Sequence, residues 1–244
     1  MVLAEEDFKV LERLELCIHP VGIKYFVRPP DGIPQLDKRM AYCEMLRKAQ
    51  EGQTFFASVE NHACEAGAYV LGQQEAEGPL ISGQFGAGLG VFKDERAAAR
   101  LYHYIPRIAP GVANYVALSP LSCLPFEADV LVLLADLRQT EILVRALSYE
   151  TGKPWISRYS AAIGCAWLLV YPYLKGEINF FPTGFGFGMR RRKLFPEGMH
   201  FFCIPFDQLQ TMLRTLRMMP WVPEPFQPHG VEYVAQLRQR LGLG

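Results

Sequence analysis

The chain lacks the features that would place it in a membrane, in a secretory pathway or on nucleic acid. The longest apolar stretches, Ala128–Ala135 and Ile163–Leu174, fall short of the roughly 20 residues that cross a bilayer. The start is acidic at positions 5–7, whereas a signal peptide begins with positive charge. Lys+Arg and Asp+Glu both number 25, so there is no basic surplus to neutralise phosphates. We therefore expect a cytoplasmic protein without membrane or nucleic-acid partners.

Common catalytic and metal motifs are also missing. No C-x-x-C pair occurs, which weighs against a zinc ribbon or a thioredoxin-like site. The 5 histidines are dispersed and form no H-E-x-x-H, and no serine lies in a G-x-S-x-G elbow. A phosphate-binding loop of the G-x-x-x-x-G-K-[ST] type is absent as well. These absences leave the cysteines and the glycine-rich turns as candidate sites.

The composition is that of a folded protein. Half of the 244 residues are hydrophobic and 20% are charged, enough to bury a core in one large domain or two small ones. In a reducing compartment the cysteines are thiols or metal ligands before they are disulfides. The 6 cysteines are Cys17, Cys43, Cys64, Cys123, Cys165 and Cys203.

Alternating helical and strand patterns predict an α/β or α+β fold with mixed sheets covered by helices. Asp129–Ala135 reads as a buried strand, and Asp94 and Asp136 stand where helix N-caps are expected. The expected strands cover 22–26, 54–59, 80–82, 129–135, 155–158, 177–181 and 200–204.

The two halves of the chain show the same order of elements. Several glycines and aromatics recur 100 residues apart, namely Gly52 and Gly152, Phe55 and Trp155, Phe85 and Phe185, Gly86 and Gly186, and Gly88 and Gly188. We interpret this as an internal duplication with halves at 1–118 and 119–220, packed about a pseudo-twofold axis. Chance alignment in a chain rich in Gly and Phe remains the alternative.

The tail, 221–244, differs from both halves. A proline-rich stretch precedes Val231–Leu241, an amphipathic helix. We expect this helix to dock on the body or on a second subunit.

Cys64 and Cys165 are the strongest candidates for chemistry. Each begins a predicted helix in a small-residue context, where exposed N–H groups would lower a thiol pKa. In a duplicated protein the two sulfurs would approach across the axis, and converging thiolates need a cation or cluster. Cys43, on the preceding helix, is a third potential ligand, with His62, another side chain or a substrate as the fourth. Buried, inert cysteines are the alternative.

The glycine-rich turns form the second candidate site. Gly86 and Gly88 precede a helix, and Gly186 and Gly188 precede the basic run Arg190, Arg191, Arg192 and Lys193. Glycine lets backbone N–H groups face a ligand, and arginine forks match carboxylate or phosphate. The turns predict a site for an anionic group on a small molecule or a partner protein. Tight turns beside a solvated basic face are the alternative.

These residues resemble the domain-of-unknown-function family one hundred and sixty-nine, an archaeal and anaerobe-associated, cysteine-rich family. The resemblance covers about residues 15–220 and rests on Pro20–Phe26, Cys43 with Ala49 and Gly52, Cys64 with Gly67 and Leu71-Gly72, Pro120-Leu121, Asp129–Leu134, Ala146–Gly152 and Gly164-Cys165. It implies a cytoplasmic protein of anaerobes whose typical cysteines match Cys43, Cys64 and Cys165. It assigns no activity and no role to Arg190–Lys193.

Three functions follow as hypotheses. The first is an iron–sulfur protein whose Cys43, Cys64 and Cys165 hold a [4Fe–4S]-type cluster between the halves, for electron transfer or activation of a small anionic ligand. The second is a metal-free enzyme or binding protein for a small anionic metabolite, using the glycine turns and Arg190–Arg192. The third is an assembly or scaffold subunit that binds its partner through the tail. The partner is another protein or a second copy of this chain in a homo-oligomer.

Overall fold

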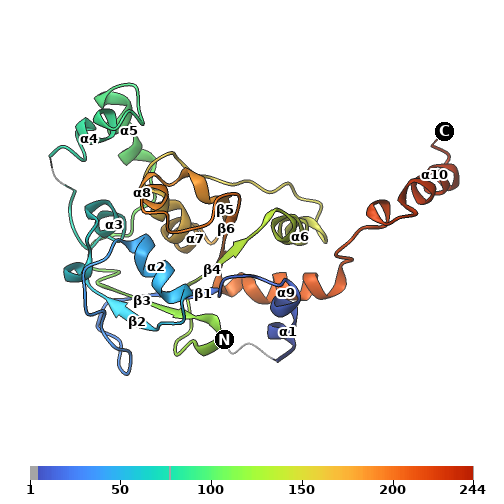
Figure 1. Ribbon diagram of the computed structural model, residues 1–244, viewed down its shortest axis with the longest axis horizontal. Helices are drawn as coiled ribbons and strands as arrows, with labels where there is room; N and C mark the ends of the chain where they lie inside the picture. The colour runs from blue at the N-terminus through green and yellow to red at the C-terminus, as the bar shows by residue number, and fades with distance from the viewer. Residues whose placement is uncertain (1–4, 77, 244) are drawn as a thin grey trace.

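The computed structural model describes residues 5–76 and 78–243 and folds them around a six-stranded antiparallel sheet (Figure 1). The strand order is β2-β3-β1-β4-β6-β5. The strands are β1 (Val21–Phe26), β2 (Phe55–Ala57), β3 (Tyr115–Pro120), β4 (Val130–Ala135), β5 (Asn179–Pro182) and β6 (His200–Pro205). Helices and strands are mixed along the chain as expected. The expected mixed sheets are wrong, because every strand pair of this sheet is antiparallel.

Both faces of the sheet are covered, which explains why β4 is a continuous apolar run. Val130, Val132 and Leu134 enter one core, and Leu131 and Leu133 enter the other. Antiparallel sheets with one solvated face show alternation, and β4 shows none because neither face meets water. The first face carries α2 (Tyr42–Gln50), α3 (Glu65–Val70) and the continuous helical segment of η3 (Ala166–Val170) and α7 (Tyr171–Lys175). The second face carries α1 (Glu5–Arg13), α6 (Leu137–Ser148) and α9 (Leu209–Met218).

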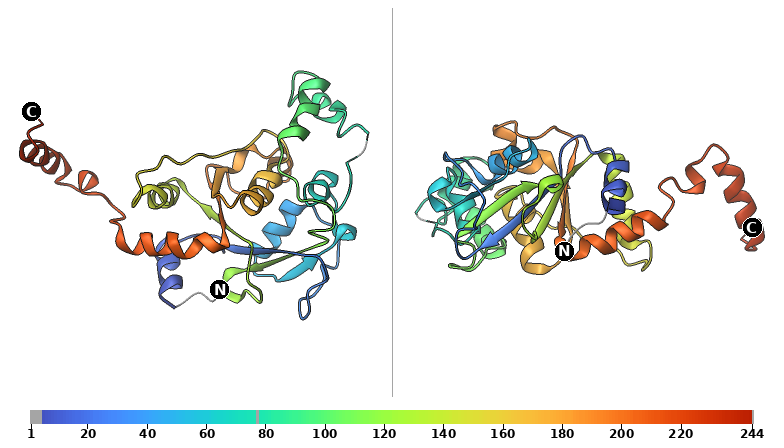
Figure 2. Two further views of the ribbon diagram at one scale, coloured as in Figure 1. Left: turned by 180° about the vertical axis from the view of Figure 1, so that it is seen from behind. Right: turned by 90° about the horizontal axis from the view of Figure 1, so that it is seen from below.

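The remaining helices are short or peripheral. Figures 1 and 2 show α4 (Gln84–Gly88) and α5 (Glu95–Tyr104) forming a projection at one edge of the molecule. The others are α8 (Phe187–Arg191), α10 (Gly230–Arg240) and the single turns η1 (Val59–Asn61), η2 (Leu121–Cys123), η4 (Thr183–Phe185), η5 (Phe206–Gln208) and η6 (Glu224–Phe226). Among the described residues, no helix has the length and apolar character needed to span a bilayer.

The two predicted N-caps are confirmed. The Asp94 carboxylate accepts a hydrogen bond of 2.7 Å from the Ala97 backbone N–H at the start of α5. Asp136 caps α6 in the same way through Gln139, whose side chain in turn accepts from the Asp136 N–H at 2.7 Å. Each cap satisfies donors that the helix itself leaves open, which is why these local signals were reliable.

Two expected strands are wrong, and one strand was not expected. Residues 80–82 form turns before α4. Residues 155–158 run beside the edge strand β5 without a ladder, because the Asn179 side chain takes their polar groups: it accepts from the Arg158 N–H and donates to the Arg158 carbonyl, both at 2.8 Å. The strand that was not expected is β3. Ser119 and Pro120 interrupt its apolar pattern, and only its pairing with β1 and β2 defines it as a strand.

The strand order is compatible with two related halves, but the duplication stays a prediction. From the centre outward, β1, β3 and β2 mirror β4, β6 and β5. The helices that directly follow the central strands do not match, since α2 lies on the first face and α6 on the second.

The C-terminal helix does not dock on the body. In Figures 1 and 2, α10 projects away from the sheet, and Val231 on it is 86% exposed. The expectation of docking on the body is therefore wrong, and docking on a second subunit stays a prediction. Trp221, at the start of the predicted tail, belongs to the body: its indole N–H donates to the Leu216 carbonyl at 2.7 Å, and Arg13 stacks 4.1 Å from its ring centre.

The exposed position of α10 predicts that residues 224–244 are dispensable for folding, whereas Trp221 is required for full stability. Deleting residues 224–244 should leave the urea midpoint of unfolding unchanged, since α10 projects into solvent. Trp221→Ala should cost about 3 kcal/mol, the lower end for removing a buried aromatic. Equal loss in both variants would contradict the assignment of Trp221 to the body. Urea unfolding followed by circular dichroism measures both.

Candidate functional site: a cavity with three thiols

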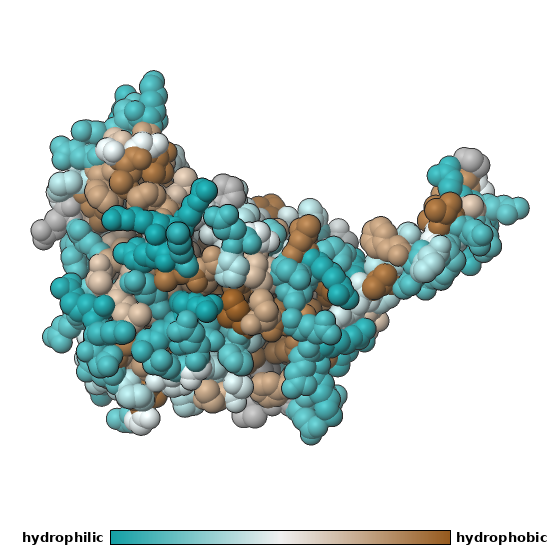
Figure 3. Space-filling model, in the orientation of Figure 1, coloured by the Kyte–Doolittle hydropathy of each residue, from teal (hydrophilic) through white to brown (hydrophobic). Residues whose placement is uncertain are grey.

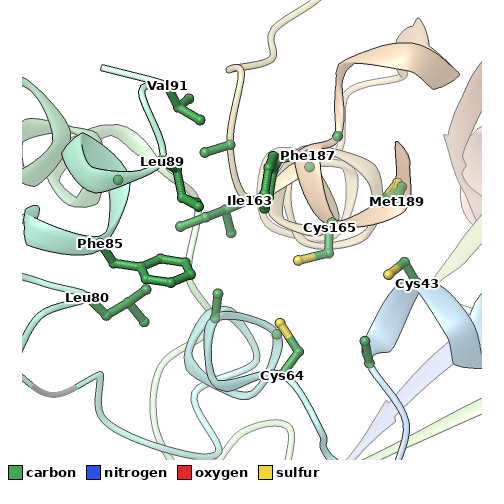
Figure 4. Close-up of a pocket in the computed structure, with 18 of the residues that line it drawn as sticks. Cys43, Cys64, Leu80, Phe85, Leu89, Val91, Ile163, Cys165, Phe187 and Met189 are labelled. Carbon is green, nitrogen blue, oxygen red and sulfur yellow. The ribbon is translucent and has the colours of Figure 1, made fainter. Parts of the chain in front are cut away.

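One cavity of about 230 Å³ on the first face brings together three of the cysteines (Figure 4). Cys43 lies in the first turn of α2, Cys64 is the N-cap of α3, and Cys165 directly precedes the π-helical turn η3. In Figure 4, the sulfurs of Cys64 and Cys165 point into the same open space, and Cys43 borders it from α2. Residues from the two halves of the chain therefore meet at one site.

Gly67 of α3 packs against the start of α2, and a Cβ there would make ordinary contacts at 3.4 Å with the Tyr42 Cβ and 3.8 Å with the Cys64 Cβ. The carbonyl of Cys64 accepts the first backbone bonds of α3, from Gly67 and Ala68. On α2, the Glu44 carboxylate accepts from the Ala41 N–H at 2.6 Å and fixes the first turn that carries Cys43. Local hydrogen bonds at the two helix starts thus place two of the sulfurs.

The pKa values of Cys43 and Cys165 are raised, which favours the neutral thiol and contradicts the prediction for Cys165. Burial raises the pKa of Cys165 well above its usual value, and the nearby Cys64 and Cys43 raise it further. Backbone N–H groups of Cys165 and Ala166 lower this pKa, as expected for a helix start, but desolvation outweighs them. Burial, followed by Cys64, raises the pKa of Cys43 to about 12, and Arg192 acts in the opposite direction. Cys64 raises the pKa of both Cys43 and Cys165 because the three sulfurs lie around one cavity.

The cysteines are not arranged to hold a single metal ion. Within residues 5–76 and 78–243, no group of three or more Cys, His, Asp or Glu side chains has that geometry.

His62, offered above as a fourth ligand, does not line the cavity. It is 2% exposed, and neither ring nitrogen has a hydrogen-bond partner among the described residues. Burial lowers its pKa to about 4, so the ring is neutral near pH 7. A cluster ligand from His62 would need the ring to move.

The glycine turns and arginines divide between two places. Gly86, Gly186, Gly188, Arg191 and Arg192 line the cavity with the thiols. Gly88 does not line it, and Arg190 lines a separate cavity near Glu197, whose carboxylate lies 3.9 Å away. The two candidate sites of the sequence, thiols and glycine turns, are therefore largely one site.

An apolar wall completes the cavity and was missed by sequence reasoning. Phe85 of α4 and Leu89, the C-cap of α4, face Ile163 and Phe187 across the opening, and Phe85 is 54% exposed (Figure 4). Ile163 has a φ of 55°, a strained backbone for a β-branched residue, two positions before Cys165. The large apolar residues that flank both glycine turns in the sequence are the signal that could have predicted this wall.

Fold and site together define an α+β protein with a three-thiol cavity on one face of its sheet. The chain belongs to the DUF169 family, described as uncharacterised ArCR, whose model matches residues 9–215. It is 33% identical over 125 residues to the uncharacterised protein MJ0308 of Methanocaldococcus jannaschii, covering 50% of this chain. The match spans about half of that relative, 53% of its length. No solved structure matches the chain.

Proposed function

We propose that the protein holds an iron–sulfur cluster of the [4Fe–4S] type through Cys43, Cys64 and Cys165. The observation that carries this proposal is the convergence of the three thiols, distant in sequence, on one largely apolar cavity. Cys43 belongs to the core of the first face, Cys64 and Cys165 pack against that core, and all three free thiols also line the cavity. Cys203, by contrast, is fully buried in β6 and behaves as a core residue.

Charge around the cavity supports the same assignment. Metal binding requires the thiols to lose their protons, which burial opposes in the metal-free protein. Arg192 lowers the pKa of Cys43, and the backbone N–H groups of Cys165 and Ala166 lower that of Cys165. Hydrogen bonds and cations beside cluster sulfurs are the protein's means of stabilising the bound state. With three protein ligands, such a cluster would supply either electron transfer or one exchangeable iron position for a small anion.

Anaerobic reconstitution tests the proposal directly. The wild-type chain should carry about four irons and four sulfides and absorb broadly near about 400 nm. The triple variant Cys43→Ser, Cys64→Ser, Cys165→Ser should carry none. Cys17→Ser, which alters an exposed cysteine outside the cavity, should match the wild type.

Folding must be shown for each variant by circular dichroism. If the folded wild-type chain contains no iron after reconstitution, the cluster proposal is contradicted. Equal iron in the triple variant would do the same.

A second function, a metal-free binding protein for a small anion, is favoured by Arg191. This side chain lines the cavity and has no ion-pair or hydrogen-bond partner among the described residues. Retained anion binding by the triple serine variant, together with absence of iron in the wild type, would favour it over the cluster.

A further inference from the structure

We propose that the cavity binds an organic carboxylate with an apolar body, whose charge is met by Arg191 and whose body lies against the α4 wall. The inference deepens the proposed function by naming the ligand class. It rests on the proposed function only for the reaction that the ligand would undergo at a cluster. The contacts that bind the ligand are made by the protein's own residues.

The wall is the first reason. Phe85, Leu89 and Phe187 remain 54%, 38% and 37% exposed although they surround one cavity. Figure 3 shows apolar surface gathered over the α4–α5 projection and bordered by hydrophilic surface. An apolar concavity rimmed by polar groups is the common form of a small-molecule site. A wholly hydrophilic anion would leave this wall facing water.

The charges are the second reason. Arg190 is placed beside Glu197, and Arg192 lies 3.5 Å from the Glu44 carboxylate and donates to the Gly188 carbonyl. Arg191 lies between them in sequence, lines the cavity and has no such partner among the described residues. A guanidinium presents paired donors that match a carboxylate. Among the described residues that line the cavity, Arg191 is therefore a cation without an ion-pair partner, and it lies beside an apolar surface.

The size of the cavity limits the ligand. A volume of about 230 Å³ lies below the roughly 300–1,000 Å³ of sites for drug-sized ligands. The ligand class is thus a small monocarboxylate with an alkyl or aryl body, rather than a nucleotide. Its body would fill the space between Phe85 and the thiols.

Calorimetric titration with matched compounds tests the charge and the body separately. Octanoate should bind at one site per chain, and octan-1-ol should bind about tenfold more weakly because it lacks the charge. Affinity should rise about fourfold for each methylene from butanoate to octanoate, the effect of burying one methylene group. Acetate should show no measurable heat of binding. Equal affinities for octanoate and octanol, or affinities independent of chain length, would overturn the proposal.

Matched variants assign the contacts. Arg191→Ala should weaken octanoate about tenfold and leave octanol unchanged, whereas Arg190→Ala should leave both unchanged because Arg190 faces another cavity. Phe85→Ser should weaken both compounds, and Tyr104→Ser, an exposed aromatic of α5 outside the cavity, should weaken neither. Equal losses in Arg190→Ala and Arg191→Ala would show that the basic run acts only as a general positive field, and the assignment would be wrong.

Titration of both the metal-free and the reconstituted protein separates this inference from the cluster. If the chain binds octanoate but takes up no iron on reconstitution, the ligand site is supported and the cluster proposal is overturned. Iron without octanoate binding leaves the cluster intact and overturns the ligand site.

Discussion

Replacing Gly83 by alanine should loosen α4 and α5 from the body of the molecule and abolish octanoate binding while the sheet stays folded. Gly83 has a φ of 87°, and a Cβ there would lie 2.0 Å from the Glu95 carbonyl oxygen and 2.7 Å from the Ala99 nitrogen. Both clashes are with backbone atoms, so a change of side-chain rotamer cannot relieve them. The left-handed conformation and the overlap each cost roughly 1–3 kcal/mol, enough to unfold a small peripheral unit.

Hydrogen exchange and titration measure this effect together. Backbone amides at 84–104 should exchange faster in Gly83→Ala, whereas those of β1 and β4 should keep their protection. The matched control is Gly88→Ala, because Gly88 ends the same helix with open space where a Cβ would lie. Unchanged exchange and unchanged binding in Gly83→Ala would show that the close approach of α4 to α5 does not hold the wall.

Arg217→Ala should destabilise the whole fold by about 2 kcal/mol. The Asp7 carboxylate on α1 is 2% exposed and lies 2.7 Å from the Arg217 guanidinium, with Gln210 donating to its second oxygen at 2.9 Å. Removing one partner of a buried pair costs 3–5 kcal/mol, and we reduce this to about 2 because Arg217 itself is 35% exposed. In this variant the Gln210 side chain would still donate its hydrogen bond to the Asp7 carboxylate.

The matched control lies on the same helix. Arg214 is 56% exposed and 3.8 Å from the Glu150 carboxylate, so Arg214→Ala should cost below about 1 kcal/mol. Urea unfolding at neutral pH gives both values. Equal effects at the two positions would show that α1 is not held to α9 by this ion pair.

Sequence reasoning was reliable where structure depends on neighbours along the chain. The strand at 129–135, the caps Asp94 and Asp136, and the helix that follows Cys64 were all legible, because each rests on a local pattern of apolar or capping residues. The duplication suggested that Cys64 and Cys165 approach each other, and they do line one cavity, although the duplication itself stays a prediction.

The site could be predicted only in part. Gly86, Gly186, Gly188, Arg191 and Arg192 share the cavity of the three thiols, but adjacent residues with the same chemistry, Gly88 and Arg190, do not. The predicted direction of the Cys165 pKa shift was wrong. The prediction considered the N–H groups at the helix start but not the desolvation that surrounding segments impose.

The sequence by itself determined the mixture of helices and strands, most of their positions and the cysteines worth examining. Only the tertiary structure decided that the sheet is antiparallel, that Cys43 joins Cys64 and Cys165, and that an apolar wall from α4 faces them. The physical reason is that capping and hydrophobic periodicity act over a few residues. Strand pairing, desolvation and the walls of a cavity instead depend on segments as far apart as α4 and α8.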